Sequence, residues 1–161
     1  MFDEVFGEVT FECGYGYLAR KEISFFGDTR EIEICINAEE DEEITQGQRD
    51  AYTALTSDLE EIQSKIARAI LEYYNGEEKG AYGPDDPDEF AEWWPDIESE
   101  EKMAENLHLD TIIIWSEFHG KNPVYVLFDR DWGGEDLEDN GVAVGIVDGE
   151  VTEVGYKDIA L

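Results

Sequence analysis

The sequence predicts an α+β fold with a mainly antiparallel sheet, because strand-like, helix-like and again strand-like patterns follow one another along the chain. Residues 2–37 alternate apolar and polar side chains, which is typical of strands with one buried face. From residue 45 the apolar side chains recur three or four positions apart, as on one face of a helix. Short apolar runs return after residue 110. We therefore expect an N-terminal meander and C-terminal hairpins covered by a capped central helix or helix pair.

The composition indicates a single domain over residues 1–161. A net charge of −31 can accompany disorder, but 42% of the residues are hydrophobic and 12% are aromatic, which is enough for a core. The chain length also suits one domain of about 100–200 residues. Residues 77–101 hold eleven acidic side chains and one lysine, together with several glycines and prolines. We expect this segment, called here the acidic excursion, to lie on the surface.

The strands are expected in two groups. The alternating positions of the first group are Val9, Phe11, Cys13, Ile32, Ile34 and Ile36. In the second group, residues 111–115 and 124–128 are continuous apolar runs, as in central strands that are buried on both faces. Residues 141–147 and 150–156 flank the pair Asp148 and Gly149, which predicts a two-residue hairpin turn.

The helical region carries two capping signals. Thr45 stands three residues before Gln48, and Ser57 stands three before Glu60, so each hydroxyl can accept a bond from a free amide of the first turn. We expect a short helix followed by a longer one, or one kinked helix, ending near residues 75–76 with Gly76 as a left-handed cap. In the acidic excursion we expect one short helix held by aromatic side chains and a second around residues 99–106.

The two cysteines are expected to be free thiols. Cys13 shares strand parity with Val9 and Phe11, whereas Cys35 shares it with Glu31 and Glu33, so they lie on opposite faces of a small sheet. The first residues carry no basic segment, and no apolar run approaches the length of a membrane span. These features predict a cytoplasmic protein that does not bind membranes.

Residues 129–140 resemble a calcium-binding loop at first sight. Asp129, Asp131 and Gly134 fall at its first, third and sixth positions. The match fails at Gly133, and again at Asn140, where a calcium loop has a bidentate glutamate. We expect no specific metal site, with Asp129 and Asp131 as weak candidates.

Catalytic groups are sparse. The chain has two histidines, His108 and His119, and neither has a histidine or cysteine nearby in the sequence. No glycine-rich phosphate loop joins a strand to a helix. The 42 acidic side chains make chance carboxylate pairs uninformative. We expect no enzymatic activity and no cofactor, and a carboxylate- or metal-dependent hydrolase is the alternative left open.

The charge indicates the kind of partner. With 42 acidic against 11 basic side chains, the protein repels nucleic acid and anionic membranes and attracts basic proteins. Aromatic side chains among carboxylates can anchor such a partner, although Trp93 and Trp94 can equally hold the excursion to the core. The expected partner-binding residues are Asp85, Asp86, Asp88, Glu89, Glu92, Trp93, Trp94, Asp136, Glu138 and Asp139.

Two stretches carry a family resemblance. They are residues 44–52 with 66–74, and residues 131–132 with 140–144, 148–149 and 154–156. Together they resemble a bacterial family of uncharacterised small cytoplasmic domains, some of which occur near toxins and look like immunity proteins. The resemblance implies no catalytic residue. The leading hypothesis is an immunity protein that neutralises a basic toxin, such as a nuclease, and the alternative binding hypothesis is a nucleic-acid mimic that inhibits a DNA-binding protein.

Overall fold

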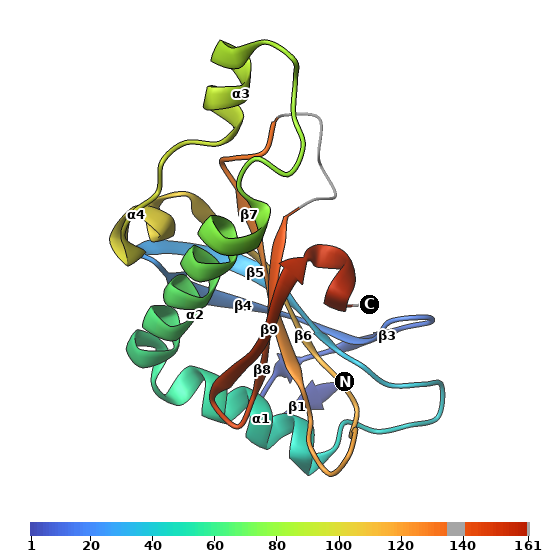
Figure 1. Ribbon diagram of the computed structural model, residues 1–161. Helices are drawn as coiled ribbons and strands as arrows, with labels where there is room; N and C mark the ends of the chain where they lie inside the picture. Colours follow the sequence, from blue (N-terminus) through green and yellow to red (C-terminus); the bar gives the residue numbers. More distant parts are fainter. Residues whose placement is uncertain (135–140, 161) are drawn as a thin grey trace.

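The computed structural model describes residues 1–134 and 141–160 (Figure 1). The strands are β1 (Phe2–Asp3), β2 (Gly7–Glu8), β3 (Thr10–Glu12), β4 (Gly16–Phe25), β5 (Asp28–Ile36), β6 (Leu107–Ile114), β7 (Val124–Arg130), β8 (Val142–Val147) and β9 (Glu150–Tyr156). The helices are α1 (Gln46–Ser57), α2 (Leu59–Tyr73), α3 (Pro87–Trp93) and α4 (Glu100–Glu105), with a π-helical turn at Tyr74–Glu78 and a 3₁₀ helix at Lys157–Ala160.

One large sheet organises the molecule. Strands β3 to β9 are neighbours in chain order, and β1 and β2 form a separate pair. Every pair of adjacent strands in the large sheet is antiparallel except β5 and β6, which are parallel. The connection between these two strands contains α1 to α4, because parallel neighbours need a long crossover. The predicted α+β class with a mainly antiparallel sheet is therefore confirmed.

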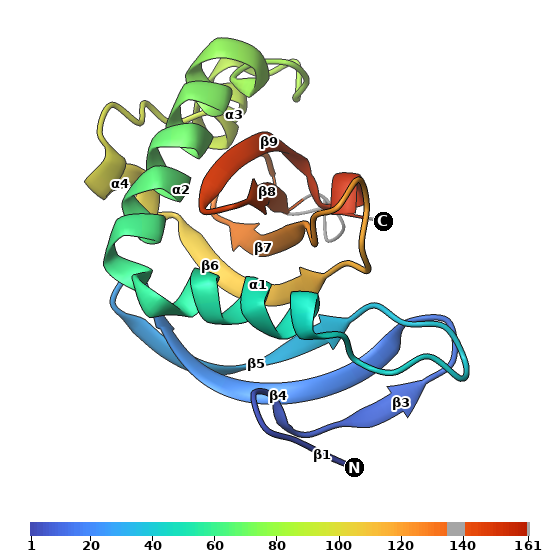
Figure 2. The same cartoon turned by 90° about the horizontal axis from the view of Figure 1, so that it is seen from below.

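The helices α1 and α2 cover one face of the sheet, and the long strands β4 and β5 bend beneath α1 (Figure 2). The predicted apolar stripe of α2 is buried at Ile62, Ile66 and Ile70. It packs in the same core as strand residues such as Ile34 and Ile112. Strands β6 and β7 lie in the interior of the strand order, as their continuous apolar runs predict.

The first capping prediction is confirmed and the second is off by one residue. Gln48 N donates to Thr45 Oγ1 over 3.1 Å, and Thr45 N donates to the Gln48 side chain over 3.0 Å. The second helix is capped by Asp58 instead of Ser57, because the Asp58 carboxylate accepts from Glu61 N at 3.2 Å. Asp58 also places a negative charge at the positive end of the helix.

The predicted glycine cap at Gly76 is wrong. The chain continues from α2 into the π-helical turn, and Gly76 is not among the residues with a positive φ angle. This turn buries Tyr74 and Glu78. The left-handed pair Asp148 and Gly149, with φ angles of 53° and 78°, does form the predicted hairpin turn.

Both cysteines are free, as predicted. Cys13 is exposed, whereas Cys35 is buried and its Sγ donates to the carbonyl of Tyr15 over 3.4 Å. Burial, and then the nearby Glu33 and Glu12 carboxylates, raise the pKa of the Cys35 thiol to about 11. Among the described residues, no helix has the length and apolar character needed to cross a membrane.

Candidate functional site: the acidic platform

The acidic excursion contains α3, and α4 begins at its C-terminal end, which confirms the two short helices expected in this region. Figure 1 shows α3 at one end of the molecule, beyond the end of β7. Five carboxylates on or just before α3 are exposed, and we call them the acidic platform: Asp85, Asp86, Asp88, Glu89 and Glu92. α3 is short, so its position depends on the contacts that hold its two ends.

The aromatic side chains of the excursion hold it to the domain. Trp94 is only 4% exposed, and its Nε1 donates to the carbonyl of Tyr82 over 2.7 Å. The ring of Tyr82 meets the Trp94 ring edge-on at 5.0 Å between centroids, and Tyr74 lies 6.1 Å away on the core side. The prediction that Trp94 contributes to the contact surface is therefore corrected, because its indole is enclosed by the protein's own side chains.

Trp93 is partly buried at the base of the acidic platform. Its ring packs edge-on against Tyr82, and its carbonyl accepts from Gly133 N at 2.8 Å. That bond joins the end of α3 to the segment that follows β7. Asp136, Glu138 and Asp139 lie outside the described residues, so their predicted place beside the platform stays a prediction.

A buried ion pair lies beneath the excursion. Arg130 on β7 donates from Nη1 to Glu78, and neither side chain is more than 4% exposed. The other Glu78 oxygen accepts from Trp132 Nε1 at 2.6 Å, and Arg130 Nη2 donates to the Tyr82 hydroxyl over 2.8 Å. The Arg130 guanidinium also lies over the rings of Trp132 and Tyr156, at 5.5 Å and 5.2 Å. Trp132 is itself only 2% exposed, so its indole is part of the core.

Further polar bonds close the base of the excursion. The Tyr74 hydroxyl donates to the carbonyl of Pro95 over 2.6 Å, and Asn75 Nδ2 donates to the carbonyl of Ile97 over 3.0 Å. Burial, and then the Glu78 carboxylate, raise the pKa of the Tyr74 hydroxyl, so it stays a neutral donor. Sequence reasoning missed Glu78 and Arg130, because a pair separated by 52 positions leaves no local pattern.

The platform carboxylates keep their charge exposed. Nine of the eleven lysines and arginines form ion pairs with carboxylates elsewhere in the described part of the chain. Within residues 1–134 and 141–160, none of the five platform carboxylates has an ion-pair partner. The platform therefore combines a fixed backbone with negative charge that a partner can neutralise.

The weak metal candidates contact cationic and histidine side chains. Asp129 accepts from Lys157 Nζ at 2.7 Å, and the same ammonium donates to Asp110 over 3.1 Å. Asp131 lies 2.9 Å from His108 Nε2. In the part of the chain that the structure describes, no group of three or more His, Cys, Asp or Glu side chains is placed to hold a metal ion.

The fold and the site define an α+β domain that carries a clamped acidic excursion. The chain belongs to the family described as "Domain of unknown function (DUF6985)", whose family model matches residues 5–161. The comparisons with curated proteins and with solved structures found no match. The family description assigns no activity, so the function is argued from the site.

Proposed function

We propose that the protein is an acidic stoichiometric binding protein, and that it acts as a cytoplasmic immunity protein that neutralises a basic toxin such as a nuclease. The observation that carries this proposal is the acidic platform, five exposed carboxylates on a segment that is clamped to the core. A nuclease that binds nucleic acid presents a basic surface, and an anionic platform is complementary to it.

Two physical effects support binding through the platform. The net charge of −31 steers a basic partner toward the protein and raises the association rate. The clamp by Glu78, Arg130, Tyr82 and Trp94 fixes the backbone before the partner arrives, which reduces the entropy lost on binding. The platform thus offers both attraction and a preformed shape.

The family resemblance favours a toxin as the partner. The motifs in residues 44–52 and 140–144 resemble a bacterial family of small cytoplasmic domains, some of which occur near toxins and look like immunity proteins. The two free cysteines are compatible with a reducing compartment.

A nucleic-acid mimic is the second candidate, and the spread of the charge favours it. The residues from Glu39 to Glu43 are also exposed, so acidic side chains cover more of the surface than the platform alone. A mimic binds several basic proteins through broad electrostatics, whereas an immunity protein binds one partner through a defined surface.

The two candidates are separated by affinity capture. The tagged protein is incubated with lysate of its source organism at a salt concentration of about 0.15 M, and bound proteins are eluted with a salt gradient and identified by mass spectrometry. The immunity proposal predicts one basic protein in stoichiometric amount, retained in moderate salt. Many basic proteins released together just above that salt concentration would support the mimic, and no retained protein would contradict both and favour the hydrolase alternative.

A further inference from the structure

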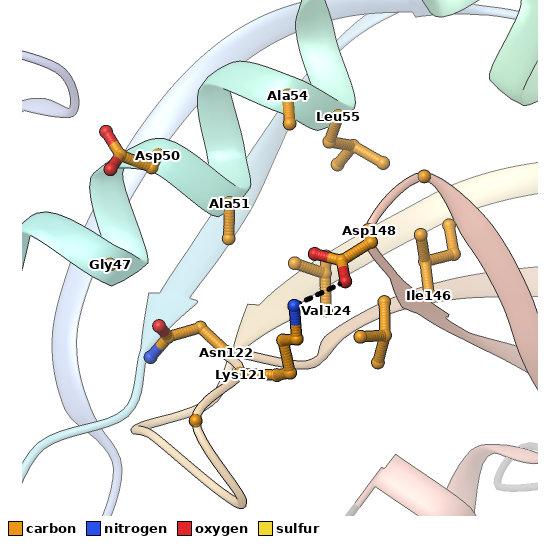
Figure 3. A pocket seen from close by; sticks show the side chains of 13 residues that line it. Gly47, Asp50, Ala51, Ala54, Leu55, Lys121, Asn122, Val124, Ile146 and Asp148 are labelled. Atoms are coloured by element: carbon orange, nitrogen blue, oxygen red, sulfur yellow. Dashed lines mark ion pairs between the residues drawn. The ribbon is translucent and has the colours of Figure 1, made fainter.

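A second candidate binding site lies at the opposite end of the molecule from the acidic platform. A pocket of about 310 Å³ opens between α1, the loop from β6 to β7 and the turn from β8 to β9 (Figure 3). Its wall includes Ala51 and Leu55 from α1, Val124 from β7 and Ile146 from β8. This volume is at the lower end of the usual range for ligand pockets, about 300–1,000 Å³, so it suits a small or slender group.

Polar side chains reach the pocket from two tight turns, and one further carboxylate of the lining, Asp50, lies on α1. Lys121 Nζ and Asp148 Oδ2 form an ion pair of 2.7 Å, drawn as the dashed line in Figure 3. Phe118 and Lys121 exchange backbone hydrogen bonds that close the first turn, and Asp148 lies in the second. The first loop also packs tightly on α1, since a Cβ added to Gly47 would come 2.2 Å from Asn122 Oδ1. The two turns that border the pocket are therefore held in place.

The chain itself places an alkylammonium group in this pocket. Lys121 contributes an aliphatic stem to the lining and brings its ammonium to Asp148. Both side chains of this pair are more than half exposed, and such ion pairs contribute little to stability. Lys121 can therefore move into solvent at little cost when another cation takes its place at Asp148.

We infer that the pocket binds an alkylammonium or alkylguanidinium group, from a lysine or arginine side chain or from a free aliphatic amine. The cation takes the place of Lys121 at Asp148, and the aliphatic stem packs against Ala51, Leu55 and Ile146, as long basic side chains do on apolar surfaces. The net charge of −31 opposes an anionic ligand at Lys121 and favours a cationic one. This inference does not depend on the acidic platform.

The test is an NMR titration of the full chain with three probes at about 0.15 M salt. The probes are Nα-acetyl-lysine methylamide, putrescine, and the neutral Nα-acetyl-norleucine methylamide. We expect both cationic probes to shift the amide signals of Ala51, Asn122 and Gly149, with no such shift from the neutral probe. Tighter binding of the lysine derivative identifies a side chain as the ligand source, and tighter binding of putrescine identifies a free amine.

Four variants make the test specific. Asp148→Asn should weaken binding at least tenfold, and asparagine is suited to the positive φ angle of 53° at this position. Ala51→Leu should block binding by filling the pocket, and leucine is a good helix former. Lys121→Gln removes the internal competitor and should strengthen binding by up to about fivefold. Glu72→Gln removes one negative charge, as Asp148→Asn does, but at an exposed position on α2, and it should leave binding unchanged.

Two results would overturn the inference. One is equal affinity of the cationic probes for the wild type and for Asp148→Asn. The other is a loss in Glu72→Gln as large as the loss in Asp148→Asn, since this would mean that the probes respond only to net charge. The spectra also show directly whether each variant is folded.

Discussion

Replacing Glu78 with glutamine tests the clamp beneath the acidic platform. The Glu78 side chain is fully buried and accepts from both Arg130 and Trp132 Nε1. Glutamine has nearly the same shape and keeps an acceptor for Trp132, so the substitution changes the charge and little else. It leaves the Arg130 guanidinium, which is 4% exposed, without its counter-charge.

The expected cost follows from that burial. Removing one partner of a buried ion pair destabilises a protein by about 3–5 kcal/mol, because the remaining charge is desolvated and unpaired. Arg130 keeps its bond to the Tyr82 hydroxyl and its contacts with the rings of Trp132 and Tyr156, so we expect the lower half of this range. At about 2–4 °C per kcal/mol for a chain of this size, Tm falls by roughly 10 °C.

The assay is equilibrium unfolding in urea, followed by tryptophan fluorescence, for Glu78→Gln, Arg130→Met and the double variant. The double variant should be more stable than the sum of the two single effects predicts, because it removes both charges together. Glu31→Gln, whose carboxylate forms an exposed pair with Arg20, serves as the matched control and should cost less than about 1 kcal/mol. A loss below about 1 kcal/mol for Glu78→Gln, or strictly additive effects, would contradict a stabilising role of the buried ion pair.

Three further predictions concern stability. Asp3→Asn removes the ion pair between Arg49 and the buried Asp3 carboxylate. Burial alone raises the pKa of Asp3, but hydrogen bonds from Arg49 and from the backbone outweigh this and lower the pKa. The Asp3 carboxylate therefore stabilises the fold at neutral pH, where the free energies of unfolding of wild type and variant should differ by about 1.5–3 kcal/mol. The two values should converge as the pH falls below about 4, and urea unfolding at several pH values measures this. Thr45→Ala removes the cap of α1 and should cost about 1 kcal/mol in the same assay, and no loss would mean that the capping box is unimportant. Trp94→Ala should destabilise the protein by about 3–5 kcal/mol, whereas Asp88→Asn should change its stability by less than about 0.5 kcal/mol. An effect of Trp94→Ala as small as that of Asp88→Asn would argue against Trp94 as an anchor.

The features that the sequence predicts well are local ones. The capping box at Thr45 and Gln48 involves residues three apart, and the turn at Asp148 and Gly149 depends on two adjacent residues. In both, the physical cause is contained in the segment itself. The α+β class and the stripe of α2 follow in the same way from the periodicity of apolar residues.

The errors arise where distant residues decide between local options. Ser57 and Asp58 can both cap a helix, and the choice between them needs the geometry of the α1–α2 corner. Gly76 is a plausible helix end, but Arg130 and Trp132 draw Glu78 into the core and extend the helical chain past it. Such contacts between distant parts of the chain leave no trace in short windows of sequence.

In the candidate site, too, the local features could be predicted from the sequence and those that depend on distant contacts could not. The acidic composition of residues 77–101 predicts an exposed, charged segment, and the five platform carboxylates are exposed. The role of Trp94 could not be decided from spacing, because an anchor and a contact residue have the same helical periodicity. Its hydrogen bond to Tyr82 decides the question.

We propose that the acidic platform, and not the net charge as a whole, binds a basic protein. Two variants with equal net charge separate these possibilities. One has the five platform carboxylates changed to amides, and the other has Glu39, Glu40, Asp41, Glu42 and Glu43 changed in the same way. All ten side chains are exposed. The measurement is the affinity of each variant, by isothermal titration calorimetry, for the basic protein that the wild type captures. If the platform is the binding surface, the platform variant loses most of its affinity while the other variant retains it. Equal losses in both variants would mean that binding depends only on net charge.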